Sequence, residues 1–104
     1  MDRKPEEEIV RLAKSFQSLK SVLRLRILAR LAEGASNVTA MQEHLRVSQP
    51  LLSWHLNKLR SAGFVETERM GREVLYHLRY EAFHAVLQDL GGLLGLSVWV
   101  DDQP

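Results

Sequence analysis

The segment from residue 48 to residue 78 constrains the fold most, because it encodes a helix with both of its ends and then a β-hairpin. The helix is indicated by apolar residues four and three positions apart, which share one face: Leu52, Leu56 and Leu59. Ser48 can cap the N-terminus through its hydroxyl, and Pro50 suits a first turn, where a missing N–H costs little. Gly63 follows the last apolar residue of the pattern, where a glycine commonly ends a helix. The sequence therefore predicts a helix that begins after Ser48 and ends before Gly63.

Beyond this helix the apolar spacing changes to every second residue, which indicates β-strands. Val65 and Thr67 alternate with glutamates, and a second alternating run ends at Leu78. Between the two runs, residues 69–72 (Arg-Met-Gly-Arg) supply the glycine of a tight turn and an arginine on each side. Arginines at the tip of a hairpin suit a DNA phosphate backbone or a narrow minor groove. A capped helix followed by a basic-tipped hairpin predicts a winged helix-turn-helix that binds DNA.

Four further segments show the apolar spacing of helices. They are expected at about Glu6–Leu19, Ser21–Ala32, Val38–Leu45, which Asn37 caps, and Tyr80–Leu90. The predicted fold is mostly α with a small β-hairpin, an α+β fold of about five helices and a two-stranded wing.

Two parts of the chain are expected to differ in role. Residues 1–92 are predicted to form one DNA-binding and dimerisation domain, and residues 93–104 an apolar, then acidic, tail. Glycines within residues 91–95 make a continuous helix unfavourable there. The tail, which includes Val98-Trp99-Val100, is expected to pack across the dimer partner, to fray, or to dock another protein.

The charge of the chain is segregated along its length. Residues 1–80 contain all 14 lysines and arginines against 9 acidic residues, whereas residues 81–104 contain four acidic residues and no lysine or arginine. The basic part is the part that should meet DNA. The absence of a cysteine, a signal peptide and an apolar run long enough to span a bilayer favours a cytoplasmic protein without a membrane partner. No phosphate loop, His-Glu-x-x-His motif or paired carboxylate motif is present, so the sequence predicts no enzyme.

Several short motifs together resemble the ArsR/SmtB family of bacterial winged-helix repressors. They are LRLRILARL at 23–31, SQ at 48–49, S-x-HL at 53–56, L-x-x-AGFV at 59–65 and R-x-GR at 69–72. The resemblance implies a homodimer that binds double-stranded DNA and regulates transcription. It also implies a dimer interface formed by the first and last helices, for which the apolar candidates are Ile9, Leu12, Phe16, Phe83, Val86, Leu87 and Leu90. The alternative is that these residues complete a monomeric core.

A helix of this kind places its N-terminal residues against base edges in the major groove. The DNA-binding candidates are Ser48, Gln49, Leu51, Ser53, Trp54, His55, Lys58, Arg69 and Arg72. Relatives usually present polar or basic residues where this chain has Leu51 and Trp54, so these two depart from the pattern. Leu51 is expected to contact thymine methyl groups, and Trp54 either lies along the sugar-phosphate wall or is buried against the wing. His55 either contacts DNA or packs at the base of the helix.

Arg24 and Arg26 are weaker DNA-binding candidates on the second predicted helix. One of them is expected instead to form a structural ion pair with a carboxylate such as Glu43.

The metal positions of the resembling family are not filled by ligands here. The cysteine positions of some members correspond to Asn37 and Thr39, and the last-helix site of others corresponds to Tyr80, Ala82, Leu93 and Leu96. Glu81 and His84, three residues apart on one helical face, are weak candidates for a different metal site. No cofactor is predicted, and a metal effector remains open.

The sequence favours a repressor that binds an inverted repeat as a homodimer, with regulation by a partner protein, by a small ligand, or by no ligand. The alternative is a winged-helix module that binds protein through the aromatic anchors Trp54 and Trp99.

Overall fold

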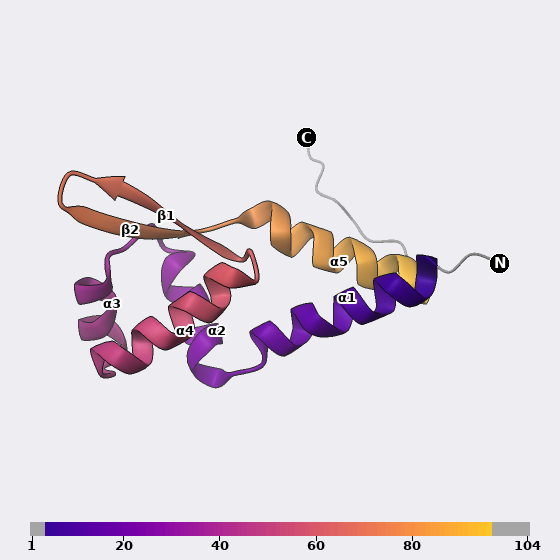
Figure 1. Cartoon of the computed structure of the whole chain (residues 1–104), viewed down its shortest axis with the longest axis horizontal. Helices are drawn as coiled ribbons and strands as arrows, with labels where there is room; N and C mark the ends of the chain where they lie inside the picture. Colours follow the sequence, from indigo (N-terminus) through magenta and orange to yellow (C-terminus); the bar gives the residue numbers. More distant parts are fainter. Residues whose placement is uncertain (1–3, 97–104) are drawn as a thin grey trace.

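A computed structural model describes residues 4–96 of the chain, and its order of elements matches the predicted one (Figure 1). The elements are α1 (Lys4–Leu19), α2 (Val22–Leu31), α3 (Val38–Leu45), α4 (Gln49–Ser61), β1 (Val65–Met70), β2 (Glu73–Leu78) and α5 (Tyr80–Leu94). The predicted winged helix-turn-helix is therefore confirmed.

Side-chain caps begin the three central helices, as polar residues before helical patterns predict. The Ser21 hydroxyl accepts a hydrogen bond from the Arg24 N–H (3.1 Å), and the Asn37 side chain accepts one from the Ala40 N–H (2.8 Å). Ser48 does the same for α4. These caps satisfy backbone donors that have no partner within the helix.

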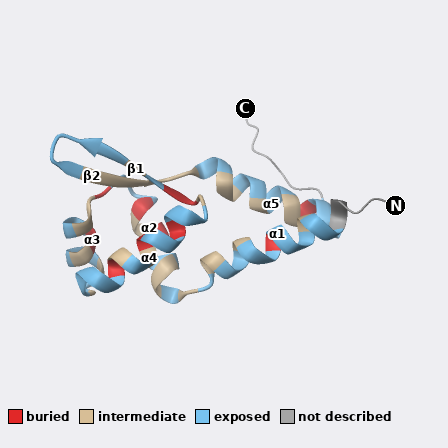
Figure 2. Ribbon diagram, in the orientation of Figure 1, coloured by how far each residue is buried: buried red, intermediate tan, exposed pale blue. Residues whose placement is uncertain are grey.

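The core lies where α2, α3 and α4 meet the start of the hairpin, and Figure 2 shows the buried residues concentrated there. Its buried members are Ile27, Leu28, Leu31, Met41, Leu52, Leu56, Leu59, Phe64 and Val65. The three leucines predicted to form the buried face of α4 are all fully buried. Burying this face fixes α4 and leaves its opposite side free for a ligand.

The wing is an antiparallel hairpin whose register runs from Val65 opposite Leu78 to Met70 opposite Glu73. Two residues form its turn, and Gly71 there has φ +65°, a conformation that favours glycine. The hairpin is attached to the loop between α2 and α3 by two backbone hydrogen bonds between Ser36 and Tyr76 (3.1 and 2.8 Å). The wing is thus tied to the helical core near the middle of β2.

The terminal helices α1 and α5 pack together and extend away from the core (Figure 1). The prediction that the last helix ends at about Leu90 is wrong, because α5 continues through Gly91 and Gly92. Gly91 is buried, and neither of these glycines takes a positive φ. The helix ends at Gly95, which adopts the left-handed conformation (φ +70°) of a C-terminal glycine.

The boundary expected at residue 92 thus falls inside α5. The predicted docking segment Val98-Trp99-Val100 lies outside the described residues. Within residues 4–96, no helix combines the length and apolar character that crossing a membrane requires.

Candidate nucleic-acid interface

The N-terminal half of α4 presents its predicted DNA-binding residues on the side opposite the core. Gln49 is exposed, and its side-chain amide donates a hydrogen bond to the Ser53 hydroxyl one turn later (2.8 Å). Leu51 is 45% exposed, so its side chain can contact a ligand. The first two turns of α4 therefore offer two polar groups and one apolar group to a ligand.

Trp54 is 52% exposed, so the alternative that it is buried against the wing is wrong. Its ring lies 5.5 Å from the Arg24 guanidinium carbon and 5.3 Å from the Lys58 ammonium nitrogen, measured to the ring centroid. Both separations are within the range of cation–π attraction. The indole thus lies within cation–π distance of two cations, one on α2 and one on α4.

His55 is half-buried and is bonded to α2. The Arg24 Nε donates to His55 Nδ1 (3.0 Å), and Arg24 Nη1 donates to the Ser18 carbonyl (2.9 Å). Because Nδ1 accepts this bond, the neutral ring carries its proton on Nε2. Burial and then the charge of Arg24 lower the pKa of His55. Both expectations for His55 remain compatible with this geometry, since only Nδ1 is occupied.

The expected ion pair between an arginine of this helix and Glu43 is not formed. Among the described residues, no ion pair is recorded for Arg24, Arg26 or Glu43. The helical periodicity of α2 could not predict the partner of Arg24, because that partner, His55, lies 31 positions further along the chain.

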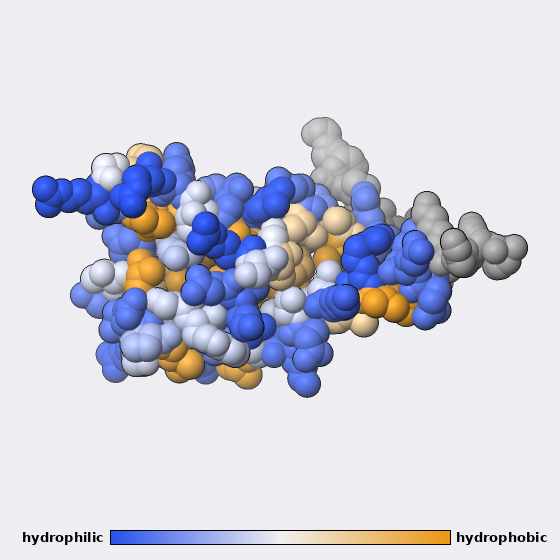
Figure 3. All heavy atoms as spheres, viewed as in Figure 1, coloured by the Kyte–Doolittle hydropathy of each residue, from blue (hydrophilic) through white to orange (hydrophobic). Residues whose placement is uncertain are grey.

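The tip of the wing carries the other basic candidates. Arg69 and Arg72 are both exposed, and Arg69 Nη1 donates to the Gly71 carbonyl (3.4 Å). Figure 3 shows strongly hydrophilic residues gathered at this tip. Figure 1 places the tip and the N-terminal end of α4 at the same end of the molecule, away from the free ends of α1 and α5. Two separate elements thus present polar or basic groups at one end.

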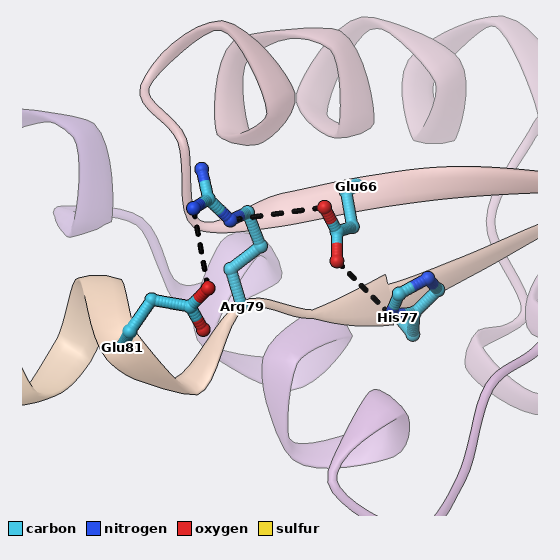
Figure 4. Close-up of polar contacts among 4 residues, drawn as sticks. All are labelled: Glu66, His77, Arg79 and Glu81. Atoms are coloured by element: carbon cyan, nitrogen blue, oxygen red, sulfur yellow. Dashed lines mark hydrogen bonds and ion pairs between the residues drawn. The ribbon is translucent and has the colours of Figure 1, made fainter.

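A polar cluster that the sequence did not predict lies at the base of the wing (Figure 4). Arg79 bridges Glu66 on β1 (3.7 Å) and Glu81 on α5 (3.2 Å), and Glu66 also lies 3.6 Å from His77. The backbone N–H of Glu81 and then Arg79 lower the pKa of the Glu81 carboxyl. The cluster links the wing to the start of α5. Only the position of Arg79 at the junction of two elements could have indicated it.

The seven interface candidates separate into two groups. Leu12 is buried, and Phe83 and Val86 pack against the core, where the ring centroids of Phe83 and Phe64 are 4.8 Å apart. Leu90 is half-buried, whereas the remaining three candidates are exposed: Ile9, Phe16 and Leu87. Leu12, Phe83 and Val86 thus pack within their own chain, and the exposed group leaves apolar surface on both terminal helices.

Glu81 and His84, the candidates for a metal site, are not joined by a third ligand in the described residues. The Glu81 carboxylate accepts a hydrogen bond from Arg79 (3.2 Å), and His84 is exposed on the next turn. Asn37, at a position where some family members carry cysteine, caps α3 and donates to Glu73 (3.3 Å). In the part of the chain that the structure describes, no three potential ligands lie together.

Comparisons with known proteins agree with this fold. Residues 21–67 match the model of the family described as bacterial regulatory protein, arsR family. The chain is 38% identical over 84 residues to the HTH-type transcriptional repressor SmtB of Mycobacterium tuberculosis, an alignment covering 80% of this chain and 62% of that protein. It is 30% identical over 88 residues to the HTH-type transcriptional regulator KmtR of the same organism, covering 85% and 68%.

Solved structures show the same likeness. An ArsR-like transcriptional regulator from Rhodococcus sp. RHA1 superposes with a TM-score of 0.79 at 26% identity, covering 84% of this chain and 82% of that one. The chain spans less than two thirds of the length of the SmtB repressor that it matches.

Proposed function

This chain belongs to the ArsR family of bacterial regulatory proteins, and we propose that it is a transcriptional repressor that binds double-stranded DNA sequence-specifically as a homodimer. The observation that carries this proposal is the pairing of two exposed elements at one end of the molecule, the N-terminal half of α4 and the arginine-tipped wing. A helix fixed by its buried face can enter a major groove, while an adjoining wing contacts the backbone or a minor groove.

The roles proposed along α4 follow from the chemistry of each side chain. Gln49 and Ser53 contact bases or phosphates, and Leu51 contacts the methyl group of a thymine. Ser48, His55 and Lys58 lie along the backbone or groove edge, with Trp54 against the sugar-phosphate wall. The proposed DNA-contacting residues of α4 and its N-cap are therefore Ser48, Gln49, Leu51, Ser53, Trp54, His55 and Lys58.

Arg69 and Arg72 act at the tip of the wing, where no carboxylate is recorded against either guanidinium among residues 6–96. Their contacts to phosphate would strengthen binding to every sequence alike.

The terminal helices form the proposed dimer interface. Ile9, Phe16 and Leu87 leave apolar side chains exposed on α1 and α5 in the single chain, and a second copy would cover them. A two-fold dimer would present two copies of α4 to successive major grooves about 34 Å apart. The operator would then be an inverted repeat, and occupation of a promoter would block transcription. A cytoplasmic location is part of this proposal.

Regulation by a partner protein, or by a ligand outside the family's known metal positions, fits the residues at those positions. Two of those positions hold Asn37, which caps α3, and Thr39, and neither side chain supplies a thiolate. The second candidate function is a protein-binding module, for which the exposed Trp54 and Leu51 on α4 are the supporting observation.

Selection of DNA fragments from the genome that encodes the chain tests the proposal. Purified protein is mixed with the fragments, the bound ones are sequenced, and the site is mapped by footprinting. We expect enrichment of fragments that share a palindrome, protected in two half-sites one helical turn apart. Failure to enrich any fragment would reject the repressor, and tight, salt-insensitive capture of one protein would favour the second candidate.

A further inference from the structure

A basic hollow of about 380 Å³ lies where the end of α1, the start of α2 and the second half of α4 meet. Three of its five lining residues are cations, namely Lys20, Arg24 and Lys58, and none is a carboxylate. The other two are Gln17 and Ser18. Within the described residues, no ion pair is recorded for any of these cations. Three positive charges around one hollow repel one another, so a bound anion would stabilise them.

Arg24 is held in place before any ligand binds. Its Nε donates to His55 and its Nη1 donates to the Ser18 carbonyl, at 3.0 and 2.9 Å. A guanidinium has five N–H donors, so three remain for a ligand. Because the protein already fixes the side chain, binding an anion there loses little rotamer entropy.

The Trp54 ring completes the arrangement. It lies within cation–π distance of both Arg24 and Lys58, and its attraction offsets part of their mutual repulsion. Lys20 is exposed, on the loop between α1 and α2, and adds a third cation to the lining. Three cations around one hollow match the several oxygens of a phosphate better than the two of a carboxylate.

We propose that this hollow binds a phosphate group, carried by the DNA backbone beside the groove that α4 enters; this rests on the proposed function. The position on α4 identifies the source of the phosphate. Lys58 lies nine residues beyond Gln49, which is about 14 Å along a helix. The major groove is about 12 Å wide, so residues at that distance from the inserted end reach the backbone that borders it.

Replacing Lys20 tests the proposal with little risk to folding, since this residue is exposed. We expect Lys20→Gln to weaken binding about tenfold, equally on selected and random duplexes, and to lower the salt slope by about 1. Lys14→Gln is the matched control, because Lys14 is an exposed cation of α1 that does not line the hollow. Equal affinity of Lys20→Gln, Lys14→Gln and the unmodified protein would overturn the proposal.

The contacted phosphate is located with duplexes that each carry one neutral methylphosphonate. At one backbone position per half-site, the methylphosphonate should weaken binding of the unmodified protein but weaken binding of Lys20→Gln much less. The neutral phosphonate and the Lys20→Gln substitution would each remove the same contact, so their effects should not add. The absence of such a position, in a protein that binds DNA, would overturn the assignment to the backbone without affecting the proposed function.

A titration with inorganic phosphate distinguishes a phosphate of the DNA backbone from a free phosphorylated ligand. The titration can be done even if the protein binds no DNA. Phosphate is titrated against the full chain while the Trp54 indole N–H is followed by NMR, with Lys20→Gln as the control. A saturable shift that Lys20→Gln weakens, without a coupled backbone position, would assign the hollow to a free phosphorylated ligand instead. No shift together with no coupled position would reject a phosphate site altogether.

Discussion

The Nε of Arg24 donates a hydrogen bond to Nδ1 of His55 across 3.0 Å, and this contact joins α2 directly to α4. The bond requires an unprotonated Nδ1, so the position of α4 on the core is coupled to the protonation state of one histidine. The same arginine approaches the exposed Trp54, which places a structural contact beside the proposed DNA-binding surface.

The stability of the fold should fall as the pH falls through the titration of His55. Burial and then Arg24 hold its pKa below the ordinary value of about 6.5. Between the ordinary and the lowered pKa, the unfolded chain binds more protons than the folded chain, so acid favours unfolding. The stabilisation is complete above about pH 6.5 and is lost as the pH falls through the lowered value. Urea unfolding measured from pH 7.5 down to pH 5 checks this.

His55→Gln is the control, because a glutamine can accept from Arg24 but does not titrate. If the pH dependence of stability is the same in the variant and the unmodified protein, the link between His55 and acid sensitivity is wrong.

Gln49→Ala and Arg72→Ala should weaken DNA binding in different ways. The glutamine can contact a base edge, so its loss should reduce discrimination between selected and altered duplexes by about tenfold. The wing arginine contacts phosphate, so its loss should weaken all duplexes alike and reduce the salt slope by about 1. Titrations with both duplex types at several salt concentrations separate the two effects. Unchanged affinity in both variants would remove α4 and the wing from the interface.

Leu87→Glu should dissociate the proposed dimer. A glutamate buried without a partner is costly, so the dissociation constant of the dimer should increase by about 100-fold or more. Leu25→Glu is the matched control, because both leucines are 55% exposed but Leu25 lies on α2, away from the terminal helices. Sedimentation velocity over a range of concentrations gives the result. A dimer that survives Leu87→Glu, or one that Leu25→Glu disrupts equally, would place the interface elsewhere.

Two glycines of the last helix should respond oppositely to replacement by alanine. Gly92 lies within α5, and nothing lies within 4 Å of an added Cβ, so Gly92→Ala should stabilise the fold by about 0.5–1 kcal/mol. Gly95 has φ +70°, so Gly95→Ala should destabilise it by about 1 kcal/mol. Urea unfolding measures both. Equal destabilisation by the two variants would contradict the observed end of α5.

Local patterns in the sequence predicted the elements because each pattern has a local physical cause. Ser48, Asn37 and Gly63 mark helix ends through hydrogen bonds or backbone conformations of their own neighbourhood. The buried leucines of α4 follow from helical periodicity alone. The end of α5 was missed because low helix propensity at Gly91 and Gly92 is a weak preference, which burial of Gly91 can outweigh.

The candidate site was only partly predictable for a different reason. Exposed residues on α4 and at the wing tip could be placed from the pattern, since each belongs to one element. The pairing of Arg24 with His55 and the bridge from Arg79 to Glu66 join residues on different elements. Such contacts depend on how the elements pack, which periodicity does not encode.

Sequence-specific binding through α4 and the wing is tested most directly by titrating the unmodified protein with the selected palindromic duplex and a scrambled duplex of equal length. The selected duplex should bind at least about 10³-fold more tightly. Its affinity should fall by about 10³-fold or more between about 50 and 200 mM salt, as expected when six or more phosphates are contacted. Equal affinity for the two duplexes, or binding that salt leaves unchanged, would contradict a repressor that recognises an operator.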